Sequence, residues 1–243
     1  MPPAILITRP APYGAEFAAM LRAQPGGDLP MILSPALVIE ARGAVPDLSP
    51  YRWLIFTSRS GVRYFAAGSA RRDIPGYAVG YATADEARRA GIDAISCSGD
   101  AQDLLARVVA DGAGGPMLHL RGAHTAADVA GTLSAAGIPA HEAVIYAQET
   151  APLTEAARMC LCGDRPVIVP VFSPRSAAAV FDGARHDAPT VVLAISDAVA
   201  VRIPDGAARE IIVADRPDTA AMLRAWPRAL AAAYRLEGTE RAE

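Results

Sequence analysis

Two segments far apart in the chain place hydroxyl and guanidinium groups directly after an apolar run. The first reads IFTSRSGVRYF at 55–65, and the second reads VFSPRSAAAVF at 171–181. In both, the apolar stretch ends in Phe and a Ser stands one or two residues before an Arg, as expected where a strand turns into a helix. Hydroxyls, guanidinium groups and the free N–H groups of a helix N-terminus all bind anions. The two segments therefore predict anion-binding corners.

Each corner also has a simpler interpretation. Ser58 and Ser173 are good N-cap residues, and a serine cap stabilises its helix by about 1 kcal/mol without any ligand. Pro174 suits the first helical position after such a cap. Arginines at exposed corners are often only solvated. For each corner taken alone, helix capping and ligand binding both stay open.

The composition excludes other kinds of chemistry. All 23 basic residues are arginine, so lysine Schiff-base mechanisms are excluded. The net charge of −3 gives no indication of nucleic-acid binding. The cysteines, and the pair His119 and His124, lack the spacing of a metal site. We therefore expect no metal site.

The start of the chain, MPPAILITRP, predicts a first strand because it lacks the basic region and long apolar run of a signal peptide. The apolar runs elsewhere fall well short of the ~20 residues that span a bilayer. We expect a cytoplasmic protein that binds neither membranes nor nucleic acid.

Short apolar runs alternate with alanine-rich helical runs, which indicates βαβ units and parallel sheets. Strands are expected at 4–8, 30–33, 53–57, 77–80, 93–97, 117–120, 138–141, 167–172, 190–195 and 210–213. Helices are expected between them, near 12–24, 59–67, 82–90, 100–110, 123–136, 153–161, 174–182, 196–203 and 217–235. Runs such as WLIFT and TVVLAI are apolar throughout, as in strands covered by helices on both faces.

An internal repeat predicts two domains. WLIFTSRSGVRYF matches VIVPVFSPRSAAAVF, and the later MLHLRG resembles the initial ILITRP, which puts Arg121 opposite Arg9. This permuted order predicts two similar flavodoxin-like α/β domains of five strands each, joined by a two-stranded linker with a cleft between them. The expected bounds are 1–33 plus 151–243 for a discontinuous domain, 45–140 for an inserted domain, and 34–44 and 141–150 for the linker strands.

Ligands of open parallel sheets bind beyond the carboxyl ends of the strands, where helix N-termini point. The chain has eight such strand-to-helix corners: TRPAP, TSRSG, GYATA, SGDAQ, LRGAH, FSPRS, ISDAV and ADRPD. Most carry Ser, Thr, Gly or Asp at the N-cap position, and several carry arginine. Together they predict binding of a ligand with many anionic groups.

These motifs, in this order, resemble the uroporphyrinogen-III synthase family over nearly the whole chain. The resemblance rests on ILITRP, IFTSRSGV, VGYATA, LRG, AVIY and FSP. It implies a cofactor-independent cyclising hydro-lyase. Its substrate would be hydroxymethylbilane, a linear tetrapyrrole with eight carboxylates, closed to uroporphyrinogen III with loss of water and inversion of the last ring. It also implies a monomer, with the preceding deaminase as a candidate partner.

The resemblance also assigns residues. The tyrosine of AVIY is Tyr146, which would assist departure of the hydroxyl as water, because a protonated phenol donates a hydrogen bond. A tyrosine that only packs in the linker is the alternative. The residues expected to bind substrate are Arg9, Thr57, Ser58, Arg59, Gly80, Thr83, Arg121, Ser173, Arg175 and Ser196.

One corner departs from the pattern. Where GYATA has Gly80 and Thr83, the second copy SDAVA has Ser196 and Val199. Because this corner lacks the threonine hydroxyl, an alternative function from another class of protein stays open. This is a non-catalytic, two-lobed anion- or tetrapyrrole-binding regulatory protein on the same fold.

Overall fold

The computed structural model describes residues 1–97, 99–125, 127–182 and 186–240. The chain forms two compact units, one of Met1–Val38 with Glu149–Glu243 and the other of Ile39–Gln148. It passes from the first unit to the second within β3 (Leu37–Ala41) and returns within β8 (Ala140–Thr150). The two units are described separately below.

The first unit contains a five-stranded sheet in the order β11-β10-β9-β1-β2, and its neighbouring strands pair in parallel. The strands are β1 (Ala4–Ile7), β2 (Met31–Leu33), β9 (Val167–Val171), β10 (Thr190–Ala194) and β11 (Glu210–Val213). β1, β9 and β10 are buried at every position, as expected for central strands with helices on both faces.

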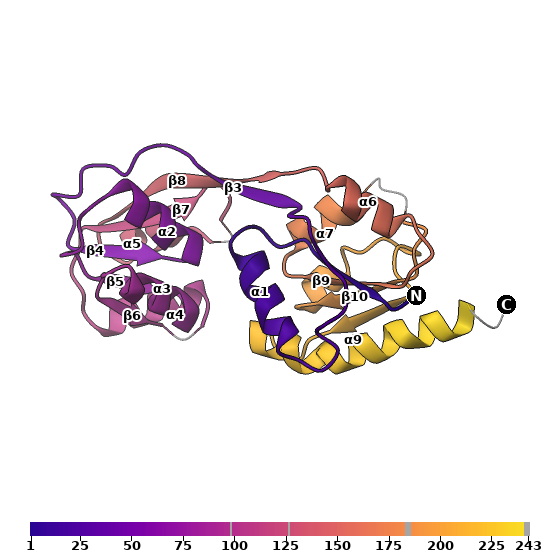
Figure 1. Cartoon of the computed structure of the whole chain (residues 1–243). Helices are drawn as coiled ribbons and strands as arrows, with labels where there is room; N and C mark the ends of the chain where they lie inside the picture. The colour runs from indigo at the N-terminus through magenta and orange to yellow at the C-terminus, as the bar shows by residue number, and fades with distance from the viewer. Residues whose placement is uncertain (98, 126, 183–185, 241–243) are drawn as a thin grey trace. The chain divides into compact units, whose positions relative to one another are not determined.

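Helices cover both faces of this sheet (Figure 1). α1 (Tyr13–Arg22) and α9 (Thr219–Glu240) pack on one face, and α6 (Glu155–Leu161), α7 (Pro174–Phe181) and α8 (Asp197–Ala200) on the other. The strands alternate accordingly, because Ile5 and Ile7 contact α1 and α9 whereas Leu6 belongs to the opposite core.

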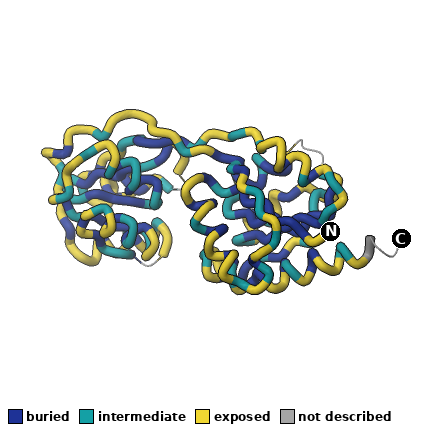
Figure 2. Tube along the Cα trace, viewed as in Figure 1, coloured by how far each residue is buried: buried dark blue, intermediate teal, exposed yellow. Residues whose placement is uncertain are grey.

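The second unit contains a six-stranded sheet in the order β3-β8-β7-β4-β5-β6. Its remaining strands are β4 (Trp53–Phe56), β5 (Gly76–Ala78), β6 (Ala94–Ser96) and β7 (Met117–Gly122). α2 (Arg59–Gly68) and α3 (Tyr81–Arg89) cover one face, and α4 (Ala101–Ala110) and α5 (Val129–Ala135) cover the other. Figure 2 shows the buried strands between helices whose outer sides are exposed.

The two-sheet α/β architecture predicted from the sequence is confirmed, with one correction. The second sheet has six strands rather than five, because β3 adds to its edge beside β8. The backbone N–H of Arg42, just after β3, donates to the carbonyl of Ile145 at 2.9 Å. An extended crossing segment meets its hydrogen-bonding needs most simply by joining the nearest free strand edge.

Two helices differ most from their expected ranges. The helix expected at 123–136 is α5, which starts at Val129, where the side chain of its N-cap Asp128 accepts the N–H of Gly131 at 2.8 Å. α9 runs on to Glu240, beyond the expected end at 235. No helix in the described part of the chain is long and apolar enough to cross a membrane.

We expect Trp226→Ala to lower the free energy of unfolding of the first unit by about 3–5 kcal/mol, the usual cost of truncating a buried Trp. Trp226 is fully buried between α9 and the sheet, and its indole N–H donates to the carbonyl of Pro25 at 3.0 Å. Urea unfolding followed by far-UV circular dichroism measures the change. Val201→Ala is the control, because Val201 is 79% exposed. An unchanged midpoint for Trp226→Ala would contradict this packing.

Candidate functional site

A pocket of about 290 Å³ opens in the second unit beyond the carboxyl ends of its central strands. Its polar lining comes from the segment after β4, from the end of β7 and the segment after it, from the start of α4 and from β8. These residues are Thr57, Ser58, Asp100, Arg121, His124, Thr125 and Tyr146. Four of the predicted site residues therefore meet here, namely Thr57, Ser58, Arg121 and Tyr146.

Ser58 links a helix N-terminus to the predicted catalytic tyrosine. It is the N-cap of α2, with extended backbone (φ −156°, ψ 154°), and its Oγ accepts the N–H of Gly61 at 3.0 Å. The same Oγ lies 2.7 Å from the phenolic oxygen of Tyr146. The hydroxyl of Ser58 therefore both caps α2 and contacts the phenolic oxygen of Tyr146.

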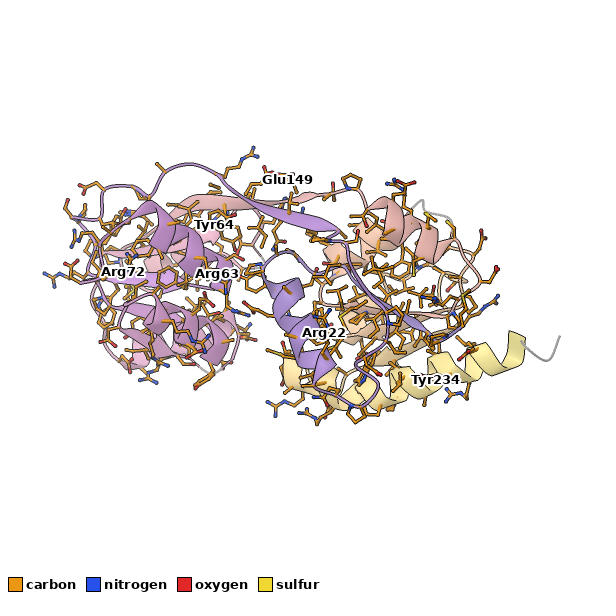
Figure 3. The ribbon with its side chains drawn as sticks, in the orientation of Figure 1. Arg22, Arg63, Tyr64, Arg72, Glu149 and Tyr234 are labelled. Atoms are coloured by element: carbon orange, nitrogen blue, oxygen red, sulfur yellow. The ribbon has the colours of Figure 1, made fainter. Side chains whose placement is uncertain are left out.

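A second tyrosine packs against the ring of Tyr146. This ring stacks on Tyr64 with ring centroids 5.6 Å apart and an interplanar angle of 16°. Tyr64 extends from α2 toward β3, where its hydroxyl donates to the carbonyl of Ile39 (Figure 3). Tyr146 is only 7% exposed, so it is anchored in the core while its hydroxyl reaches the pocket.

Gly122 makes room for this ring. The pairing of β7 with β8 shifts between Arg121 and Gly122, and Gly122 lies opposite Tyr146. A Cβ atom at Gly122 would stand 2.7 Å from carbons of the Tyr146 ring. A bulge carrying glycine is therefore what allows the tyrosine to lie across the end of β7.

Thr57 forms a second polar pair beside the first. Its Oγ1 lies 3.0 Å from Nε2 of His119 on β7. His119 is fully buried, and burial, reinforced by the charge of Arg121, lowers its pKa to about 4. The imidazole is thus neutral at neutral pH. Its Nδ1 has no hydrogen-bond partner among the described residues.

The arginines near this pocket are engaged with glutamates. Nε of Arg121 donates to Glu142 at 2.8 Å, and this bond holds the pKa of that carboxyl below its ordinary value. Arg59 and Arg63 both form ion pairs with Glu86, and the side chain of Arg63 is marked in Figure 3. Burial raises the pKa of Glu86, but the two arginines outweigh it and hold the pKa below its ordinary value.

Two further predicted residues of this unit lie at the start of α3. Gly80 is the N-cap residue, with extended backbone, and Thr83 is buried in the first turn. Neither is among the residues that line the pocket, and neither is Arg59.

The predicted residues of the first unit lie at its own corners. Ser173 caps α7 by accepting the N–H of Ser176 at 3.1 Å, and Arg175 follows in the first turn. Ser196 is the N-cap residue of α8, without a side-chain cap hydrogen bond. The guanidinium of Arg9 stacks over the ring of Phe172, 4.0 Å from its centroid.

The two units share a layout but not a chemistry. The order β6-β5-β4-β7 corresponds to β11-β10-β9-β1, and the Ser173 backbone (φ −159°, ψ 153°) nearly reproduces that of Ser58. Aligned through these serines and the strand pairings, Phe172 corresponds to Thr57 and Ile7 to His119. The partner of Ser173 is the hydroxyl of Ser176 at 2.8 Å, where Ser58 has Tyr146.

Sequence reasoning missed three contributors to the site. Tyr64 looks like an ordinary helix residue, and the role of Gly122 depends on a bulge that no local motif announces. His119 carried a usable signal, since it is a polar residue within the apolar run MLHL. In the sequence it is weighed only together with His124, as part of a pair that lacks the spacing of a metal site.

Comparisons with known proteins identify relatives of this architecture. The family model for uroporphyrinogen-III synthase HemD matches residues 28–224. The crystal structure of uroporphyrinogen-III synthetase from Helicobacter pylori is 16% identical, with a TM-score of 0.66 over 94% of this chain and 99% of that chain. A mutant uroporphyrinogen III synthase from the extremely thermophilic bacterium Thermus thermophilus is 13% identical, with a TM-score of 0.51 over 95% and 99% of the two chains. The comparison with curated proteins gives no match.

We expect His119 to make the second unit less stable as the pH falls from 6.5 toward about 4. Its pKa is lower in the native state, so in this range the unfolded chain binds a proton that the native chain does not. The loss should reach about 3 kcal/mol and level off below the native pKa. His119→Leu should remove this part of the slope in urea unfolding between pH 7 and 4. The exposed His124 serves as control through His124→Leu, and an unchanged slope in His119→Leu would contradict the prediction.

Proposed function

We propose a mechanism for this chain from the premise that it belongs to the uroporphyrinogen-III synthase family, whose model matches residues 28–224. The family's reaction forms uroporphyrinogen III from a linear tetrapyrrole. The finer proposal is that the chain acts as a cofactor-independent cyclising hydro-lyase on hydroxymethylbilane. The observation that carries it is the 2.7 Å contact between Ser58 and Tyr146 at the edge of a pocket.

In the first step, the bond between the hydroxymethyl carbon and its oxygen breaks. The oxygen leaves as water after taking a proton from the phenol of Tyr146, and electrons from the attached pyrrole fill the vacancy at carbon. The last pyrrole then attacks through its substituted carbon, and rearrangement through a spiro intermediate inverts that ring. A final proton lost from the macrocycle returns to the phenolate, so the enzyme is unchanged.

Ser58 is well suited to prepare Tyr146 for this step. Because its Oγ already accepts the N–H of Gly61, its own O–H can donate to the phenolic oxygen. That direction leaves the phenol hydrogen available for the leaving hydroxyl and stabilises the phenolate that forms. Ser58 is then a positioning residue for Tyr146 as well as a helix cap.

The remaining predicted residues are proposed to hold substrate carboxylates. In the second unit these are Thr57, Arg59, Gly80, Thr83 and Arg121, and in the first unit they are Arg9, Ser173, Arg175 and Ser196. Helix N-termini and neutral donors fix the orientation of carboxylates, and binding energy far from the reacting carbon can offset the strain of ring inversion. A cytoplasmic location, a monomeric state and supply by the preceding deaminase stay predictions.

Incubated with freshly generated hydroxymethylbilane, the protein should form mainly the type III isomer. Free bilane closes without inversion, so isomer separation of the oxidised porphyrins distinguishes catalysis from spontaneous closure. A product mixture equal to that of the buffer control would contradict the proposed function and favour a binding protein.

Tyr146→Phe should lower kcat by a factor on the order of 10 to 10³, the usual worth of one general acid, while it leaves substrate affinity nearly unchanged. The variant keeps the ring that stacks on Tyr64 and removes only the hydroxyl. Steady-state kinetics of type III formation measure the effect. An unaltered kcat would show that Tyr146 has a packing role only.

Ser58→Gly and Ser173→Gly form a matched pair, because both serines cap helices with almost the same backbone conformation. Glycine at an N-cap costs only a few tenths of a kcal/mol, so both variants should keep near-normal melting temperatures. We expect Ser58→Gly to lower kcat because Tyr146 loses its partner, and Ser173→Gly to affect KM alone. Equal effects of the two variants on kcat would contradict the positioning role.

A further inference from the structure

We propose that His119 is a positioning residue that fixes the hydroxyl of Thr57 as a hydrogen-bond donor toward the pocket, where it receives a substrate carboxylate. This inference rests on the proposed function and assigns a task to a buried residue outside the pocket lining. It is carried by the 3.0 Å contact between Thr57 Oγ1 and His119 Nε2, by the burial of the imidazole and by the position of Thr57 in the lining.

The direction of this hydrogen bond follows from the surroundings of the imidazole. A neutral imidazole carries one N–H, on either Nδ1 or Nε2. With the hydrogen on Nδ1, a buried donor would have no partner among the described residues, and orphaned buried N–H groups are rare. With the hydrogen on Nε2, the donor is satisfied by Thr57 and only an acceptor lone pair stays unpartnered. The second arrangement is favoured.

This tautomer determines what Thr57 presents to the pocket. Because its oxygen accepts from His119, the hydroxyl hydrogen of Thr57 is left for another acceptor. Thr57 is half-buried and lines the pocket beside Ser58, so that acceptor can come from a ligand. A neutral donor of fixed orientation suits a carboxylate, and the low pKa of His119 keeps the imidazole neutral over the physiological range.

The first unit shows that the fold does not require this pair. At the corresponding positions it has Phe172 and Ile7, and Ile7 is part of an apolar core. His119 lies on the same strand as Leu118 and Leu120 but alternates with them, which directs it to the face covered by α4 and α5. An apolar residue would fill that place without the cost of burying a polar ring. The histidine therefore points to a role beyond packing.

The test is a double-mutant cycle read out by binding and by kinetics. Fluorescence titration with uroporphyrin III, a stable octacarboxylate, measures affinity in Thr57→Val, His119→Met and the double variant. We expect Thr57→Val to weaken binding about tenfold, as for a lost hydrogen bond to a charged group. His119→Met should weaken it by about three- to tenfold, through loss of the donor's orientation. In the Thr57→Val background, His119→Met should change nothing further.

Matched controls separate positioning from packing. Thr57→Ser keeps the hydroxyl and should bind nearly as the unaltered protein does. Leu118→Met introduces the same side chain one residue away on the opposite face of β7 and should leave affinity unchanged. In kinetics, Thr57→Val and His119→Met should raise KM for hydroxymethylbilane while kcat changes little, because the contact serves ground-state and transition-state binding alike.

Two results would overturn the proposal. One is a His119→Met effect of the same size with and without the Thr57 hydroxyl, which would mean packing. The other is no effect of His119→Met on affinity in the otherwise unaltered protein. Failure of the proposed function is seen separately, since the unaltered protein would then yield no excess of the type III isomer, whatever the cycle shows for uroporphyrin III.

Discussion

The candidate site depends on one hydrogen bond, between Ser58 on the corner after β4 and Tyr146 on β8. The two residues are 88 positions apart in sequence, so the contact exists only when β4, β7 and β8 are assembled in register. Its geometry further requires a glycine at the β7 bulge and a second tyrosine behind the ring. A backbone irregularity, a helix cap and an aromatic stack thus converge on the placement of one phenolic hydroxyl.

The two units show how one architecture can be given two chemistries. Both place a capping serine at the carboxyl end of a central strand, with nearly identical backbone angles. In one unit the serine faces a tyrosine, and in the other it faces a second serine. The residue before each serine differs likewise, as a threonine bound to a buried histidine or as a phenylalanine under an arginine. The shared layout explains the sequence repeat. Among the described residues, only the second unit places a tyrosine hydroxyl beside the capping serine, so only this unit offers a group that could donate a proton in a bond-breaking step.

The architecture was predictable from the sequence because short, uniformly apolar runs alternate regularly with alanine-rich helical runs. It also predicted Ser58 and Ser173 as caps, since strand-to-helix corners have a local signature of hydroxyl residues followed by helix formers. The segment 34–44 is predicted as a linker strand but not as a sixth strand of the sheet, because edge pairing depends on which strand edge lies free and not on the run LVIEA itself. The contribution of Gly122 could not be predicted for the same reason, because a glycine is required there only when Tyr146 lies opposite it. Local chemistry is readable from sequence, but cross-strand partners are fixed by register.

The electrostatics of the pocket favour neutral donors over free charges. Nε of Arg121 donates a hydrogen bond to the carboxylate of Glu142, and its Nη1 donates to the carbonyl of Gly122 at 2.8 Å. The same guanidinium therefore ties β8 to the bulge peptide, which places it to support Tyr146 whether or not it meets a substrate carboxylate. Partly exposed ion pairs are worth at most about 1 kcal/mol, so Glu142 orients the arginine more than it stabilises the fold. The groups left to bind a ligand are uncharged hydrogen-bond donors of fixed orientation, namely Thr57, Ser58 and the N-terminus of α2. Donors of this kind distinguish the shape of a polyanion rather than its total charge, and shape is what a reaction that inverts one ring of a flexible chain must control.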